Sequence, residues 1–75
     1  MSELKRLSGQ ETIKILKKYG FIQIRQKGSH VILKKITGDE EIGCVVPLHK
    51  ELAIGTLKEI LKQAKILLEE FIKNL

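Results

Sequence analysis

Two glycine-containing turns in the middle of the sequence restrict the fold more than any other feature. They fall at residues 27–29 and 37–40 and separate three segments, residues 21–26, 30–36 and 41–46, that have the alternation or the β-branched content of strands. Gly28 can adopt the positive φ angle that a tight turn needs. Pro47 ends the third segment because it cannot donate to a strand ladder. The pattern predicts a three-stranded antiparallel meander.

Helical patterns flank these segments on both sides. Ser8 and Glu11 have the S-x-x-E spacing of a capping box, an amphipathic stripe follows, and Gly20 supplies a C-terminal stop. Thr56 and Glu59 repeat the capping-box spacing and predict the start of a second helical region. That region is either one helix to the C-terminus or two helices with a kink near residues 65–66.

The order of elements predicts an α+β fold, αβββα(α), in one domain over residues 1–75. A three-stranded antiparallel sheet with its helices packed on a single face is the compact arrangement for this order. Cys44 has no second cysteine to pair with and lies in the apolar run 42–46, so we interpret it as a small core residue in a reducing compartment.

The net charge of +5 is unevenly distributed. Nine cations and two carboxylates precede residue 36, giving +7, whereas five cations and seven carboxylates follow, giving −2. A basic half favours a polyanionic partner, nucleic acid ahead of anionic lipid, and a solvated lysine-rich surface is an equally weighted alternative. No apolar run approaches the ~18 residues that span a bilayer, and residues 1–7 lack a signal-peptide core. We therefore expect a cytoplasmic protein.

The alternation in the second predicted strand divides its side chains between two faces. If Val31 and Leu33 face the helices, His30, Ile32, Lys34 and Ile36 face away from them. Isoleucines beside a histidine and a lysine on an uncovered sheet face would suit a surface that a partner covers. Scattered apolar residues on an ordinary surface are the alternative.

His30 is the candidate catalytic residue. The sequence has no H-E-x-x-H, no cysteine pair and no P-loop, so familiar metal and nucleotide sites are not supported. Cleavage of RNA requires only removal of the 2′-hydroxyl proton and neutralisation of charge at phosphorus. An imidazole suits the first task. The candidates for the second are Arg25, Lys27, Gly28, Ser29, Lys34 and Lys35, the two turn residues acting through their backbone N–H groups.

Both histidines have simpler interpretations. A histidine at the start of a strand is commonly an ordinary surface residue. His49 could protonate the leaving 5′-oxygen as an auxiliary acid, but a turn residue bonded to backbone is the favoured interpretation.

Several short motifs in one order resemble the HicA-type mRNA interferase toxins of toxin–antitoxin systems. The G-S-H element at residues 28–30 is followed by V-P-x-H at 46–49 and by G-T-L-x-x-I-L-x-Q-A at 55–64. The resemblance extends over nearly the whole chain, beginning with S-G-Q-E at 8–11. The chain is similar to members of that family in its short length as well.

The resemblance implies a double-stranded-RNA-binding-like αβββα fold and an RNase that cuts mRNA without a metal or other cofactor. It implies that His30 is catalytic, that Gly28 and Ser29 present it, and that a HicB-type antitoxin covers the active site. The family often has glycine and then serine or threonine after the Q-A pair; Lys65 and Leu67 stand there instead, which favours a continuous helix. The rival functions are a non-catalytic RNA-binding module and a protein-interaction domain.

Overall fold

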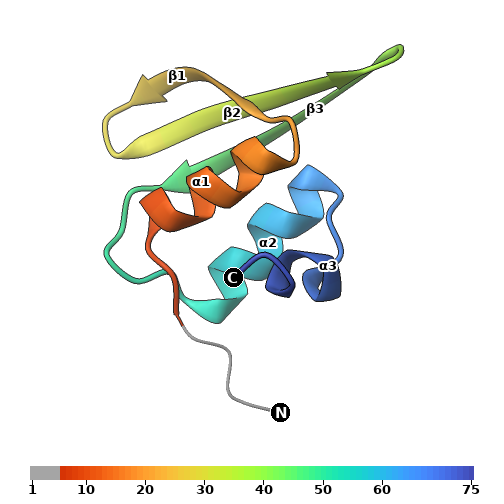
Figure 1. The fold of residues 1–75 in the computed structure, drawn as a ribbon. Coiled ribbons are helices and arrows are strands. Elements are labelled where there is room, and N and C mark those ends of the chain that lie inside the picture. Colours follow the sequence, from red (N-terminus) through yellow and green to blue (C-terminus); the bar gives the residue numbers. More distant parts are fainter. Residues whose placement is uncertain (1–5) are drawn as a thin grey trace.

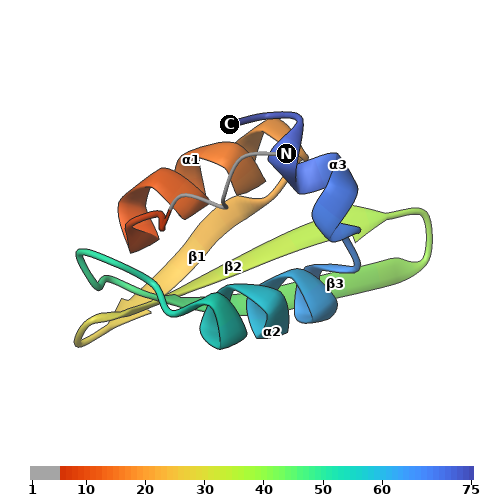
Figure 2. The ribbon, with the colours of Figure 1, turned by 90° about the horizontal axis from the view of Figure 1, so that it is seen from below.

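The computed structural model describes residues 6–75 as three helices and one three-stranded sheet. The helices cover one face of the sheet and leave the other face open (Figures 1 and 2), which confirms the predicted α+β fold. Residues 1–5 lie outside the described residues. They include Glu3 and Lys5, which belong to the charge count above, and most of residues 1–7, the segment that lacks a signal-peptide core. The elements are α1 (Gly9–Lys18), β1 (Ile22–Lys27), β2 (His30–Thr37), β3 (Glu40–Pro47), α2 (Ile54–Ala64) and α3 (Leu68–Ile72).

The sheet is the predicted antiparallel meander in the order β1-β2-β3. Its two turns are shorter than predicted, because Lys27 pairs with His30 and Thr37 with Glu40 inside the strand ladders. Each turn therefore has two residues, and the first of each is a glycine with a φ angle of 61° or 57°. Such turns match the twist of the flanking strands, so no further turn residue is needed. Phe21, predicted in the first strand, precedes β1 and is buried.

The central strand β2 supplies the middle of the core. Val31 and Leu33 are 2% and 0% exposed and face the helices, as their alternation predicted. Cys44 and Val46 of β3 pair with them across the ladder and are also buried. The helix side of the core is formed mainly by Leu16, Phe21, Leu57, Ile60, Leu61 and Phe71.

The predicted capping box at the start of α1 is confirmed. The Glu11 N–H donates to Ser8 Oγ at 3.0 Å, and the Ser8 N–H donates to Glu11 Oε1 at 2.9 Å. At the other end of the helix, the Tyr19 hydroxyl donates to the Glu70 carbonyl oxygen at 2.9 Å. That bond ties α3 to the end of α1.

The predicted start of the second helical region at Thr56 was wrong. The helix α2 begins at Ile54 with Ala53 as its N-cap, and the Leu57 N–H donates to the Ala53 carbonyl oxygen at 2.9 Å. No side chain caps this end. A capping motif is a weak local preference, whereas burial of the apolar stripe beginning at Leu57 provides most of the stability of such a helix.

The C-terminal helical region is broken at Lys65, where the sequence predicted no forced break. Lys65 has a left-handed backbone, with φ 59° and ψ 39°. The Ile66 N–H donates to the Leu61 carbonyl oxygen at 3.0 Å, and the Lys65 N–H donates to the Lys62 carbonyl oxygen at 3.2 Å. These two bonds form a Schellman motif. The chain turns back here and buries Phe71 of α3 completely.

Replacing Lys65 tests this left-handed residue. A left-handed conformation costs a residue with a β-carbon roughly 1 kcal/mol more than glycine. The variants Lys65→Gly and Lys65→Ala both lose the exposed ion pair with Glu40, so that loss cancels between them. We expect Lys65→Gly to be the more stable of the two by roughly 1 kcal/mol in urea denaturation. Equal stabilities would contradict the left-handed assignment.

Cys44 should be unreactive, since burial raises the pKa of its thiol from 9.0 to about 11. The thiolate is the reactive form, and this change lowers its fraction at pH 8 by roughly a hundredfold. We expect iodoacetamide to alkylate the folded chain at pH 8 roughly 100 times more slowly than the urea-unfolded chain. A similar rate in both states would show that the thiol is accessible and ionised in the fold.

Candidate functional site

The β1–β2 turn presents His30 at the first position of β2. Gly28 and Ser29 form the turn, and the side-chain amide of Gln26 donates to the Gly28 carbonyl oxygen at 3.0 Å. From the other side, the Leu48 N–H donates to the Ser29 carbonyl oxygen at 2.7 Å. The turn is therefore held both by its own strand and by the segment that follows β3.

His30 lies on the open face of the sheet. It precedes the buried Val31, so its side chain points away from the helices, and it is exposed. Lys27 pairs with it directly across the ladder, and Arg25 pairs with Ile32 two positions along. A hollow on this face is lined by Ile24, Arg25, Ile32 and Lys34. An imidazole and cationic side chains therefore occupy one face.

The same face exposes apolar side chains. Ile22, Ile24 and Ile36 are 59%, 51% and 70% exposed. A bulge between Gln23 and Arg25 shifts the β1 register at Ile24. The division of β2 side chains between the two faces is thus confirmed, and the uncovered face is a mixture of isoleucines and cations.

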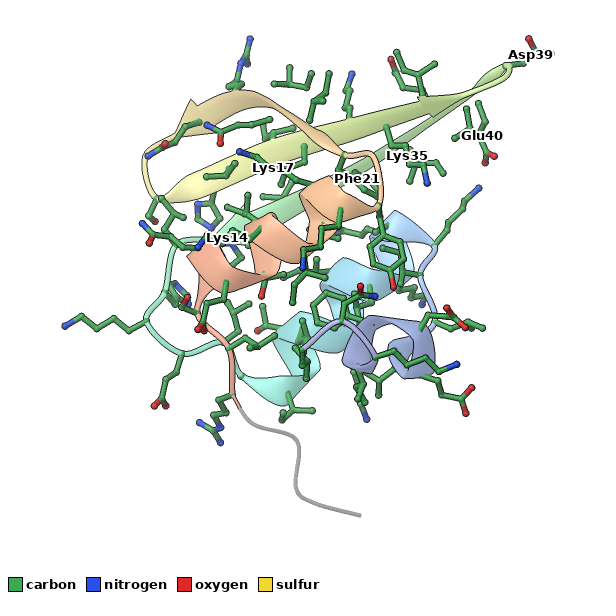
Figure 3. All side chains as sticks on the ribbon, in the orientation of Figure 1. Lys14, Lys17, Phe21, Lys35, Asp39 and Glu40 are labelled. Carbon is green, nitrogen blue, oxygen red and sulfur yellow. The ribbon has the colours of Figure 1, made fainter. Side chains whose placement is uncertain are left out.

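The two adjacent lysines of β2 are separated by the sheet. Lys34 faces the open side, where its ammonium lies 3.4 Å from a Glu41 carboxylate oxygen. Lys35 faces the helices, with its ammonium 5.9 Å from the centre of the Phe21 ring, a cation–π contact visible in Figure 3. Lys35 is therefore not on the face that carries His30, although the sequence grouped it with the other candidate contacts.

His49 occupies a different position. Its backbone carbonyl oxygen accepts the Gly9 N–H at 2.9 Å, and its exposed side chain lines a hollow with Ser8, Gln10, Leu48 and Lys50. This hollow shares no residue with the one beside Arg25. The backbone of His49 has a definite structural task, which is to bind the start of α1.

Gly9 is a structural residue of the site that the sequence did not single out. A β-carbon at this position would lie 2.1 Å from the Pro47 carbonyl oxygen and 3.0 Å from the Leu48 α-carbon. The first turn of α1 thus packs directly against Pro47 and Leu48, and the Leu48 N–H in turn bonds to the turn before His30. A glycine at the start of a helix is unexpected, because most other residues favour the helix more. In the sequence, this was the only indication that Gly9 makes a close contact.

No three histidine, cysteine, aspartate or glutamate side chains among residues 6–75 come together as a metal site would require. Within that part of the chain, no helix is long and apolar enough to cross a membrane.

The fold and this face define a small α+β protein that presents an exposed histidine and several cations on an uncovered antiparallel sheet. The model of the HicA toxin family, described as the HicA toxin of bacterial toxin–antitoxin systems, matches residues 9–66. The chain belongs to this family, so it is the toxin component of such a system and has a cognate antitoxin. No curated protein matches the chain.

Substituting Gly9 tests the contact between α1 and the His30 turn. In Gly9→Ala, the added carbon meets backbone atoms that cannot rotate away, so we expect a loss of about 2 kcal/mol in the free energy of unfolding. The matched control is Gly55→Ala, because nothing lies within 4 Å of a β-carbon there. We expect the control to be neutral or slightly stabilising in the same urea titration. Equal effects at both glycines would show that the contact is not tight.

Proposed function

We propose that the chain is a cytoplasmic, metal-independent mRNA endoribonuclease that inhibits translation, with His30 as its catalytic residue. The observation that best supports this proposal is that His30 is exposed on an uncovered face, with Lys27 directly across the ladder and Arg25 on the same face. Membership of the HicA toxin family supports the toxin role.

The proposed reaction begins with proton transfer from an RNA 2′-hydroxyl to His30. The 2′-oxygen attacks the adjacent phosphorus, the bond from phosphorus to the 5′-oxygen breaks, and the leaving oxygen takes up a proton from solvent water. The products are a 2′,3′-cyclic phosphate and a 5′-hydroxyl. A positioned imidazole contributes typically 10²–10⁴-fold to such a proton transfer.

Cations near His30 would stabilise the charge that grows on the phosphoryl oxygens. Lys27 and Arg25 are exposed on the same face, and Lys34 would exchange its Glu41 partner for a phosphate. The N–H groups of Gly28 and Ser29 are further candidates, since nothing lies within 4 Å of the place where a β-carbon of Gly28 would be. The proposal does not use Lys35, whose side chain faces the helices.

We also propose that the cognate antitoxin is of the HicB type and covers the open face. Burial of Ile22, Ile24 and Ile36, which are exposed in the toxin, would provide the apolar part of that interface. The same contact would block access of RNA to His30.

A non-catalytic RNA-binding module remains the second candidate, because the same cations would bind RNA without cutting it. Both functions predict salt-sensitive affinity for RNA. Turnover separates them.

The first test compares the wild type with His30→Ala on a single-stranded RNA in EDTA. We expect the variant to cut at least about 100 times more slowly while it binds the RNA as before. His49→Ala is the matched control, since His49 is the other histidine and is also exposed; we expect it to keep its activity within a few-fold.

Three results would contradict this proposal. They are undiminished cleavage by His30→Ala, loss of wild-type activity in EDTA, and efficient cleavage of an all-DNA oligonucleotide, which lacks the 2′-hydroxyl. Binding of RNA without any cleavage by the wild type would favour the binding module.

A further inference from the structure

A second basic surface lies between α1 and β1, apart from the open face. On α1 it consists of Gln10, Lys14 and Lys17, all exposed. Their spacing of four and then three residues places them on one side of the helix. Figure 3 shows Lys14 and Lys17 on the side of α1 that faces the sheet.

The β1 part of this surface consists of Gln23 and Gln26. These residues pair with Leu33 and Val31, so they belong to the face of the sheet that the helices cover. Leu33 and Val31 are buried, yet Gln23 and Gln26 are exposed. The inner side of β1 is therefore open to solvent at these two positions, next to α1 (Figure 2). We call the five residues Gln10, Lys14, Lys17, Gln23 and Gln26 the α1–β1 surface.

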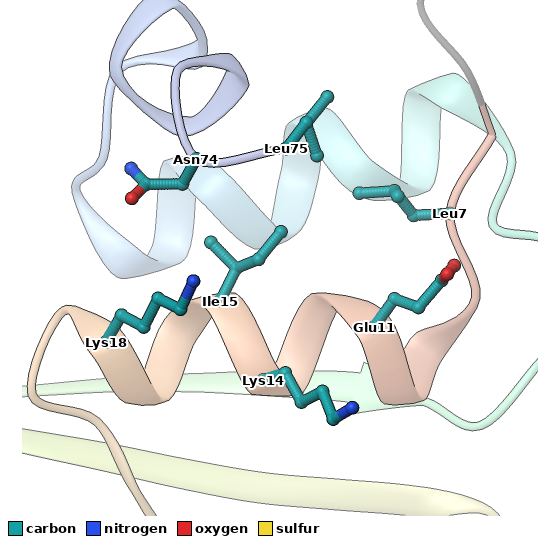
Figure 4. A pocket seen from close by; sticks show the side chains of 7 residues that line it. All are labelled: Leu7, Glu11, Lys14, Ile15, Lys18, Asn74 and Leu75. Carbon is teal, nitrogen blue, oxygen red and sulfur yellow. The ribbon is translucent and has the colours of Figure 1, made fainter.

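The side chains of the α1–β1 surface suit an anion. Two ammonium groups and three amides can all donate hydrogen bonds, and no carboxylate of residues 6–75 lies within 4.0 Å of the Lys14 or Lys17 ammonium. Glu11 accepts a hydrogen bond from the Ser8 N–H and lines a groove above α1 with Ile15 and Lys18, and Lys14 lies at the border of this groove as well (Figure 4). The Glu11 carboxylate thus accepts from the backbone at the start of α1 and forms no ion pair with Lys14 or Lys17.

The α1–β1 surface lies near the turn that presents His30. Gln10 follows Gly9, whose N–H donates to the His49 carbonyl oxygen, and Leu48 donates to the Ser29 carbonyl oxygen. Figures 1 and 2 show that α1 begins at the end of the molecule where the β1–β2 turn lies and ends where β1 starts. Because a helix rises about 1.5 Å per residue, Gln10 to Lys17 covers roughly 10 Å leading away from this turn.

We propose that the α1–β1 surface binds the sugar–phosphate backbone of the RNA on one side of the bond that is cut. Lys14 and Lys17 contact phosphates, and the glutamines contact phosphate or ribose oxygens. These contacts hold the strand in register without reading its sequence. The inference rests on the proposed function, since it concerns the substrate of the same site.

The test measures the salt dependence of binding to a 2′-O-methyl single-stranded RNA, which the proposed mechanism cannot cut. The full chain is compared with Lys14→Gln/Lys17→Gln and with the matched control Lys58→Gln/Lys62→Gln, which removes two exposed lysines from α2. Each lost phosphate contact lowers the slope of log K against log salt by about 0.7. We expect the α1 variant to lose about 1.4 of slope and roughly tenfold in affinity at 0.1 M salt.

Cleavage of the unmodified RNA provides the second readout. We expect the α1 variant to keep the wild-type kcat and to show a raised KM, because His30 and its neighbours are unchanged. If the wild type binds and cuts RNA but the α1 variant behaves like the α2 control, this inference is wrong and the proposed function is unaffected. If the wild type does not bind RNA, the proposed function and this inference both fail.

Discussion

The contact between the first turn of α1 and residues 47–49, at the end of β3 and just after it, is the constraint on which the rest of the structure depends. It brings Gly9 against the Pro47 carbonyl oxygen and bonds it to His49. From the same segment, Leu48 bonds to the turn before His30. Three parts of the chain that are distant in sequence therefore meet at one end of the sheet. The position of His30 depends on the packing of the helices as well as on its own hairpin.

Residues with strong local preferences allowed correct predictions from the sequence. The Ser8–Glu11 capping box, the alternation of β2 and the glycines of both turns set local geometry directly. The start of α2 and the break at Lys65 depend instead on burial of Leu57 and Phe71, which local propensity does not report. For the site, charge alone grouped Lys34 with Lys35, although the two-residue period of a strand separates them.

The open face combines two requirements that usually occur on separate surfaces. Contacts with RNA favour cations, whereas a stable protein interface needs apolar side chains at its centre. Here Arg25 and Lys34 line the same hollow as Ile24 and Ile32. Under the proposed function, an antitoxin that occupies this hollow excludes RNA from it directly.

The two edges of the sheet determine how another molecule can approach it. On β3, the Val45 N–H donates to the Gln63 side chain of α2 at 3.2 Å, so one outward donor already has a partner. On β1, the bulge at Ile24 and the charges of Arg25 and Lys27 disturb the other edge. Both are devices by which sheets resist pairing with a further strand. The toxin can therefore expose a partly apolar sheet face in the absence of its partner, while the features of both edges disfavour edge-to-edge association of toxin molecules.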